Sequence, residues 1–320
     1  MDDYDKILHL IRSNQKFVIS THINPDGDAI GSELALYSFL TELNKKVWIV
    51  NTDVTPLVYS FLPNVAQIKH VPPSEQADVL IVVDAGGLKR IGSKLSTILP
   101  SNKIVVSIDH HVTNESFADY NLVEPNACAT CEILYRLIRR YGMPIGKERA
   151  ICLYTGIMND TGSFRYSNTT PTAHRVAADL IPEGVQVNEI YRRVYETVPQ
   201  GTIRLLAKVL NTLEITPDGK IAWLYVNQQM FKETGTKPED VEGFTDYPRA
   251  IDTVDVVVFL RELENGSTKV SFRSQNNVTV DKIAADYGGG GHKYAAGCTV
   301  NMPYDKLAKV LVDDIQKRLN

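Results

Sequence analysis

The sequence predicts an α/β protein: an N-terminal domain whose mostly parallel sheet is flanked by helices, a helical linker, and a smaller C-terminal α+β domain. Short β-branched runs alternate with longer helical patterns in the first part of the chain, which is the order of strands and crossover helices in a parallel sheet. From residue 213 onward the expected strands come closer together. A chain of 320 residues is also long enough for about two domains. We therefore expect domains at 1–196 and 213–320, joined by a helical linker at 197–212.

The sheet of the N-terminal domain is expected to begin at Lys16–Ser20, an apolar run of strand length. The next stretch, Asp28–Leu43, places Ile30, Leu34 and Phe39 at helical spacing. The same two patterns recur along the chain. They predict strands at Lys46–Asn51, Asp78–Asp84 and Lys103–Asp109, and helices at Ala129–Tyr141, Lys147–Met158, Pro171–Ile181 and Val187–Val194.

Past these helices, the amphipathic stretch Pro199–Leu213 is expected to form the connector to the C-terminal domain. In that domain, Glu264-Asn265-Gly266-Ser267 predicts a hairpin turn between two strands. The expected elements are strands at Ile221–Val226, Ile251–Leu263 and Thr268–Arg273, a short helix near Asp281–Tyr287, a glycine run at Gly288–Gly291 and a last helix from Pro303.

Composition and charge narrow the class of protein. Apolar residues make up 43% and charged residues 22% of the chain, close to globular averages, which disfavours a disordered, collagen-like or coiled-coil protein. No apolar run approaches the ~20 residues that a membrane-spanning helix needs. The acidic start MDDYDKILHL lacks the order of a secretory signal, and four cysteines are too few for a disulfide framework. We expect a cytoplasmic protein with no membrane partner. Its net charge of −4 argues against non-specific binding of long duplex nucleic acid.

Four segments place potential metal ligands at the end of a predicted strand or helix. They are His22–Asp28, Asp84, Asp109-His110-His111, and Asp160. Alone, an aspartate such as Asp84 would be interpreted as a helix cap or turn former. In a parallel sheet, however, the carboxyl ends of the strands share one edge, so we expect these segments to converge there.

Such convergence has an electrostatic consequence. Four carboxylates gathered at one edge, those of Asp26, Asp28, Asp84 and Asp160, would repel one another unless protons or cations neutralised them. Together with His22 and His110 they form a set of oxygen and imidazole ligands that suits Mn²⁺, Mg²⁺, Fe²⁺, Co²⁺ or Zn²⁺. Six ligands are too many for one catalytic ion, but they suit two ions roughly 3.5–4 Å apart, an arrangement that polarises phosphate oxygens.

The same residues also resemble a known family, the DHH phosphoesterase superfamily, which takes its name from the triplet Asp109-His110-His111. His22–Asp28, Asp84, the triplet and Asp160 match its motifs in order, and Gly288–Gly297 (GGGGHKYAAG) resembles the glycine-rich signature of its DHHA1 subfamily. The resemblance covers nearly the whole chain. Within the superfamily it is strongest to the bifunctional oligoribonucleases and pAp phosphatases.

This resemblance implies a role for each matched residue. One ion would be held by His22, Asp26 and Asp84, and a second by Asp28, Asp84, His110 and Asp160, with Asp84 as the bridge. Asp109 would orient an imidazole rather than bind metal, and His111 would stabilise the charge on the reacting phosphate. The chain departs from the pattern at Ala85-Gly86-Gly87, where relatives often carry polar residues. This departure leaves the metal ligands intact and concerns local substrate contacts.

Residues that bind the substrate are expected in the C-terminal domain. Arg273 is a candidate phosphate clamp because a guanidinium binds phosphate oxygens in a fork, and Ser274 is a weaker candidate beside it. Consecutive glycines can turn backbone N–H groups toward an anion, to which a histidine would add a donor or a stacking surface. The resemblance favours a loop that holds substrate over the metals, formed by Gly289, Gly290, Gly291 and His292. The structural alternatives are a flexible connector for the glycine run and a solvated strand residue for Arg273.

Taken together, the resemblance implies a two-metal hydrolase that cuts short single-stranded RNA to mononucleotides and converts pAp (adenosine 3′,5′-bisphosphate) to AMP and phosphate. Mn²⁺ is the expected ion, with Mg²⁺ or Co²⁺ as alternatives. A phosphodiesterase for cyclic di-AMP or linear pApA, a single-strand DNA exonuclease and a nucleotide sensor without turnover remain alternative functions. A homodimer is one candidate assembly. No role is assigned to Cys128 or Cys131.

Overall fold

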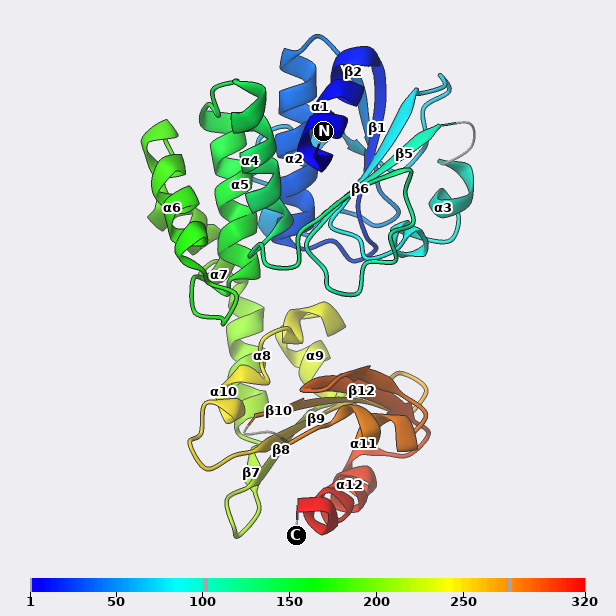
Figure 1. Ribbon diagram of the computed structural model, residues 1–320. Helices are drawn as coiled ribbons and strands as arrows, with labels where there is room; N and C mark the ends of the chain where they lie inside the picture. Colours follow the sequence, from blue (N-terminus) through cyan, green and yellow to red (C-terminus); the bar gives the residue numbers. More distant parts are fainter. Residues whose placement is uncertain (1, 100–102, 276–277, 320) are drawn as a thin grey trace. The chain divides into compact units, whose positions relative to one another are not determined.

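The computed structural model (Figure 1) describes residues 2–99, 103–275 and 278–319. The chain divides into two compact units, Met1–Thr197 and Val198–Asn320. None of the helices within the described ranges is both long enough and apolar enough to span a bilayer.

The first unit is built on a six-stranded, fully parallel sheet in the order β3-β2-β1-β4-β5-β6. Its strands are β1 (Lys16–Ser20), β2 (Lys46–Val50), β3 (Ile68–Lys69), β4 (Val79–Val83), β5 (Ile104–Asp109) and β6 (Tyr120–Val123). The strand order reverses between β1 and β4, which are neighbours. In doubly wound sheets, ligands bind outside the carboxyl ends of the strands at this switch point.

Helices cover one face of this sheet, and shorter elements cover the other (Figure 1). The helices of the whole unit, of which α3 lies on the second face, are α1 (Asp3–Ser13), α2 (Gly27–Glu42), α3 (Leu95–Ile98), α4 (Thr130–Tyr141), α5 (Lys147–Asp160), α6 (Pro171–Leu180) and α7 (Val187–Tyr195). Because side chains alternate along a strand, Phe17 and Ile19 of β1 pack against α2, α4 and α5, while Val18 packs with the residues around α3 on the opposite face. Both faces are therefore buried, and these strands are continuously apolar.

Glycines allow α2, α4 and α5 to pack closely. A Cβ added to Gly31 of α2 would lie 2.5 Å from the carbonyl oxygen of Cys152 in α5. A Cβ on Gly156 of α5 would collide with Sγ of Cys131 in α4 and would lie 2.8 Å from Oδ1 of Asp28 in α2. The three backbones approach one another beside Asp28, and this close packing positions its carboxylate.

The second unit is a mixed sheet in the order β11-β12-β10-β9-β8-β7, in which only β8 and β9 pair in parallel. Its strands are β7 (Glu214–Ile215), β8 (Ile221–Val226), β9 (Val256–Glu262), β10 (Thr268–Ser274), β11 (Gly290–His292) and β12 (Ala295–Val300). Its helices are α8 (Gln200–Leu210), α9 (Gln228–Thr234), α10 (Asp246–Arg249), α11 (Asp281–Asp286) and α12 (Tyr304–Leu319). Residues of α11 and α12 pack on one face, and residues of α8 and α9 pack on β8 and β9 from the other.

Most of the expected elements are present, but two expectations in the second unit are wrong. The strand expected over Ile251–Leu263 begins only at Val256, because the N–H of Val254 donates to the carbonyl of Ile251 and closes a turn. The glycine run is not a loop. The N–H groups of Gly288 and Gly289 donate to carbonyls at the end of α11, and Gly290–His292 pairs with β12 as a strand. The helices α1, α3, α9 and α10 and the strands β3, β6, β7 and β12 are additional to the elements expected.

Candidate metal centre

The segments that follow β1 and β4, the end of β5 and the end of α5 converge at the carboxyl edge of the first sheet. Potential ligand atoms fall into three groups, and within each group the atoms lie within 4.8 Å of one another. The groups are His22, Asp26 and Asp84; Asp28, His110 and Asp160; and Asp84, His110 and His111. All six residues expected to bind metal are included, and Asp84 takes part in two groups. The structure therefore brings together residues that span positions 22 to 160.

Both histidines of the expected ligand set are oriented by backbone carbonyls. Nδ1 of His22 lies 2.8 Å from the carbonyl oxygen of Ile23, and Nδ1 of His110 lies 3.3 Å from that of Ala127. Because a carbonyl can only accept, Nδ1 donates in each case, and Nε2 is left as the atom that can bind a cation. These Nε2 atoms face carboxylates: that of His22 lies 3.6 Å from Asp84 Oδ2, and that of His110 lies 3.5 Å from Asp160 Oδ2. This is how proteins commonly orient metal-binding imidazoles.

The aspartates at the start of α2 are held by backbone N–H groups. Asp26 is the N-cap of the helix, and its Oδ1 accepts from the N–H groups of Asp28 and Ala29 at 3.0 and 3.1 Å. Asp28 is fully buried, and its two oxygens accept from the N–H groups of Thr130 and Cys131 at 2.6 and 2.9 Å. The helix cap is therefore Asp26, whereas Asp28 points its carboxylate away from α2 toward the first turn of α4.

Asp84 occupies a strained position at the centre of the cluster. Its φ is +54°, in the left-handed region, which costs energy for a residue other than glycine. Its N–H donates to the carbonyl of Ile108 at 3.0 Å, and its side chain is 3% exposed. Strained residues of this kind concentrate at functional sites, where the surrounding structure holds them in place.

The charges of the cluster favour added cations. Burial, and after it the neighbouring carboxylate of Asp28, raises the pKa of Asp84 well above its usual range. The same two causes raise the pKa of Asp160 to about 7. Burial alone would lower the pKa of His110, but Asp28, Asp160 and Asp84 outweigh it and raise the pKa. Without a cation, the cluster therefore retains protons to limit repulsion between its carboxylates. The mixed carboxylate and imidazole donors fit divalent cations, which would replace these protons.

Asp109 makes a different set of contacts from those of the expected ligands. Its Oδ1 lies 2.7 Å from Nδ1 of His111 and accepts the N–H of His110 at 2.8 Å, and its Oδ2 accepts from Nδ2 of Asn114 at 2.6 Å. Burial acts to raise the pKa of Asp109, but the hydrogen bonds from His111 and Asn114 outweigh it, so the pKa is lowered. Asp109 belongs to none of the three groups found among the described residues. It fixes the ring of His111, whose pKa this hydrogen bond raises.

The residues expected to bind substrate lie in the second unit. Lys269, Ser271 and Arg273 alternate along one face of β10 and line a hollow of about 320 Å³, together with Arg261 of β9. Ser274 is not on this face: it is buried, and its hydroxyl donates to the carbonyl of Val278 at 2.6 Å.

The four remaining residues of the expected substrate site, Gly289, Gly290, Gly291 and His292, lie in or beside β11. A Cβ on Gly291 would lie 2.6 Å from the carbonyl oxygen of Ala295, so close strand pairing requires a glycine there. The side chain of His292 lies outside the described part of the structure.

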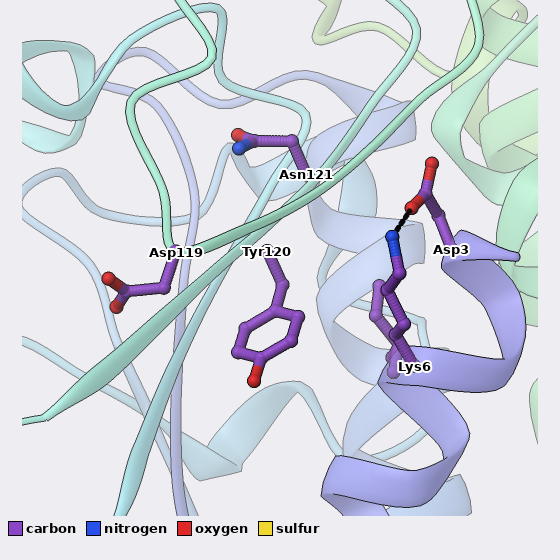
Figure 2. Close-up of a pocket in the computed structure, with 6 residues that line it drawn as sticks. Asp3, Lys6, Asp119, Tyr120 and Asn121 are labelled. Carbon is purple, nitrogen blue, oxygen red and sulfur yellow. Dashed lines mark hydrogen bonds and ion pairs between the residues drawn. The ribbon is translucent and has the colours of Figure 1, made fainter. Parts of the chain in front are cut away.

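A second hollow, of about 470 Å³, lies between α1 and β6 and holds none of the expected site residues (Figure 2). Its cation, Lys6, pairs with Asp3 at 2.8 Å, as Figure 2 shows. Asp119 is partly engaged, because its Oδ2 accepts the N–H of Val105. The hollow therefore offers a ligand little unpaired charge, and the metal cluster is the stronger candidate site.

Comparison with known proteins identifies the family of this chain. Residues 16–157 match the N-terminal domain of the DHH family, and residues 218–320 match the DHHA1 domain. A Thermus thermophilus protein named bifunctional oligoribonuclease and PAP phosphatase NrnA is 34% identical over 94% of this chain and 89% of its own length. The chain belongs to the DHH family.

Other relatives and solved structures are also similar to this chain. A Bacillus subtilis protein of the same name is 26% identical over 96% of each chain. The crystal structure of an exopolyphosphatase-related protein from Bacteroides fragilis is 31% identical, covers 98% of this chain and 96% of its own, and superposes with a TM-score of 0.91. The fold is also shared with exonuclease RecJ bound to manganese, at 16% identity and a TM-score of 0.53.

Proposed function

We propose that this protein is a two-metal phosphoesterase that hydrolyses short oligoribonucleotides to mononucleotides and pAp to AMP and phosphate. The observation that carries the proposal is the shared position of Asp84, which lies in one ligand group with His22 and Asp26 and in another with His110. The relatives named oligoribonuclease and PAP phosphatase support the choice of substrates.

The proposed ion sites use residues already close together. His22, Asp26 and Asp84 would hold one ion, and Asp28, Asp84, His110 and Asp160 the other. When bound, two divalent ions neutralise the carboxylates, draw charge from phosphate oxygens and favour deprotonation of an attacking water. We propose Mn²⁺ as the working ion, with Mg²⁺ and Co²⁺ as alternatives, because each accepts carboxylate and imidazole ligands.

His111 is the proposed residue that stabilises charge on the phosphate. Asp109 is ionised and accepts from Nδ1, so the protonated ring carries its second N–H at Nε2. The raised pKa of His111 keeps the ring cationic to a higher pH than a free imidazole. A cationic donor of fixed orientation stabilises the negative charge that grows on phosphate oxygens in the transition state. His111 is also 42% exposed, so a ligand can reach it.

We propose that the second unit binds a phosphate of the substrate. Arg273 offers a forked donor, and Lys269 and Ser271 stand on the same face of β10. Two carboxylates, Glu239 and Glu242, also line this hollow and would discourage a second anion. The hollow is therefore better suited to a single phosphate than to the backbone of a long single-stranded nucleic acid. This is consistent with short oligonucleotides and pAp as substrates.

The direct test is turnover by metal-stripped protein, with and without added Mn²⁺, on four substrates in parallel: pAp, linear pApA, cyclic di-AMP and a five-nucleotide RNA. The proposal expects Mn²⁺-dependent release of mononucleotide from the RNA and pApA, and of phosphate from pAp. Cleavage confined to cyclic di-AMP and pApA would instead assign the enzyme to the breakdown of dinucleotides. Binding without turnover of any of the four would indicate a nucleotide sensor.

A further inference from the structure

Thr130, the first residue of α4, contacts two different carboxylates of the metal centre. It is fully buried. Its N–H donates to Oδ2 of Asp28 at 2.6 Å, and its hydroxyl donates to Oδ1 of Asp84 at 3.0 Å. We propose that Thr130 is a positioning residue that fixes the carboxylates of Asp28 and Asp84 relative to each other, and so sets the affinity for both ions. This inference rests on the two-metal function proposed above.

The contact with Asp28 uses the first turn of α4. Ala129 stands at the N-cap and has no side-chain acceptor, so the N–H groups of Thr130 and Cys131 need an outside partner. Asp28 supplies it, with one oxygen on each N–H group. The helix end thus orients both oxygens of a carboxylate that comes from another helix. A substitution of the Thr130 side chain leaves these two backbone bonds in place.

The contact with Asp84 depends on the hydroxyl alone. Oδ1 of Asp84, which accepts it, lies 3.6 Å from Nε2 of His110, whereas Oδ2 lies 3.6 Å from Nε2 of His22. By engaging Oδ1, the hydroxyl fixes which oxygen faces which histidine.

A matched set of variants separates the hydroxyl from packing. Thr130→Val keeps the shape and removes the donor, and Thr130→Ser restores the donor while removing a methyl group. Thr155→Val is the control, because Thr155 is also fully buried in a helix of the first unit, but its hydroxyl donates to the carbonyl of Ile151 in the same helix at 2.8 Å. Thr130→Ala serves if the valine variant does not fold.

The experiment is calorimetric titration of Mn²⁺ into metal-stripped protein, a readout that does not require activity. Loss of a partner that orients a metal ligand typically costs roughly 10–100-fold in metal affinity. We expect Thr130→Val to lose affinity in this range, Thr130→Ser to return to within a few-fold of the wild type, and Thr155→Val to match it. At saturating Mn²⁺, the kcat of Thr130→Val should lie close to the wild-type value. At limiting Mn²⁺, its activity should fall further below that of the wild type.

Three outcomes overturn the inference, and they do not lead to the same conclusion. If the wild type binds two Mn²⁺ ions and Thr130→Val binds them equally well, the positioning role is wrong while the two-metal function stands. The same holds if Thr130→Ser is as weak as Thr130→Val, since packing would then explain both. If the wild type binds no Mn²⁺, the proposed metal centre itself fails, and the role of Thr130 fails with it.

Discussion

Nδ1 of His111 lies 2.7 Å from Oδ1 of Asp109, and the two side chains have opposite surroundings: that of Asp109 is fully buried, whereas that of His111 is 42% exposed. Asn114 holds the other oxygen of the carboxylate at 2.6 Å. A buried carboxylate therefore fixes an imidazole that solvent and ligands can reach. Two members of one sequence motif thus have different surroundings, and we propose different tasks for them.

Asp109→Asn tests this division of tasks. The variant loses the negative charge that raises the pKa of His111, so the alkaline limb of the kcat profile should move to lower pH. Each pKa unit lost lowers the protonated fraction above the pKa about tenfold. Mn²⁺ binding should change little, because Asp109 is not expected to be a ligand. The control is Asp179→Asn, which removes a carboxylate that accepts from the Tyr135 hydroxyl. An unchanged pH profile would contradict the role given to Asp109.

Asp84→Ala should abolish activity and weaken binding of both ions, because Asp84 lies in two ligand groups. The metal content of purified protein, measured by inductively coupled plasma mass spectrometry, checks this. Asp78→Ala is the control: Asp78 precedes the same strand and accepts the backbone N–H groups of Gln15 and Lys16, at the opposite edge of the sheet. Retention of two tightly bound ions by Asp84→Ala would rule out a bridging role.

Gly156→Ala should destabilise the first unit and disturb its metal centre. In an exposed helix, alanine is favoured over glycine by about 1 kcal/mol. Here the added Cβ would collide with Sγ of Cys131 and lie 2.8 Å from Oδ1 of Asp28, and such overpacking typically costs about 1–3 kcal/mol. We expect a lower melting temperature together with weaker Mn²⁺ binding. A melting temperature above that of the wild type would show that the helices can move apart to accommodate the added Cβ without a loss of stability.

The metal-free protein should become less stable as the pH rises. The pKa of Asp160 is raised to about 7, and that of His110 is raised above its ordinary value of 6.5. The folded protein therefore holds these protons to a higher pH than the unfolded chain does. The free energy of unfolding falls as the pH rises from the ordinary aspartate pKa of 3.8 through about 7, and it falls further above 6.5 as His110 loses its proton. Divalent ions bind the deprotonated groups, so the rise in melting temperature caused by Mn²⁺ should be larger at pH 8 than at pH 6. Thermal unfolding with EDTA or Mn²⁺ at both values measures this, and an equal rise at both would contradict it.

Arg273→Ala should raise KM for phosphorylated substrates and leave metal content unchanged, because Arg273 and the metal cluster lie in different units. Arg273→Lys should recover only part of the loss, since lysine keeps the charge but lacks the fork. Arg249→Ala is the control: Arg249 is a surface arginine of the same unit, paired with Asp246. Steady-state kinetics on pAp test the prediction, and an unchanged KM for Arg273→Ala would remove Arg273 from the site.

The metal cluster could be predicted from the sequence because its geometry follows from one rule. Parallel strands bring their carboxyl ends to a common edge, so residues that follow β1 and β4 must lie close to the end of β5. The same rule says nothing about Thr130 or Asn114. Thr130 reaches the cluster because α4 packs closely on α2 and α5, and Asn114 because its loop folds back over Asp109. Contacts of this kind depend on tertiary packing and leave no local pattern.

The glycine run shows a second limit of sequence analysis. Consecutive glycines predict freedom of the backbone, and a loop was the natural expectation. In the structure, Gly291 lies against Ala295 of β12, in a strand pairing that excludes a side chain. The expectation that Ser274 lies beside Arg273 in the substrate site is wrong for a simpler reason. Strand residues alternate between faces, so the residue next to Arg273 had to point to the other side of the sheet.

The strand order of the first unit also has a consequence for how the enzyme matures. β1 lies at the centre of the sheet and is the first strand made, but its partner β4 comes about sixty residues later, and the last ligand, Asp160, follows at the end of α5. Pairings between distant segments form slowly, because the chain must close long loops before their contacts are made. A nascent chain therefore cannot complete the proposed ion sites until Asp160 has been synthesised and the sheet has closed.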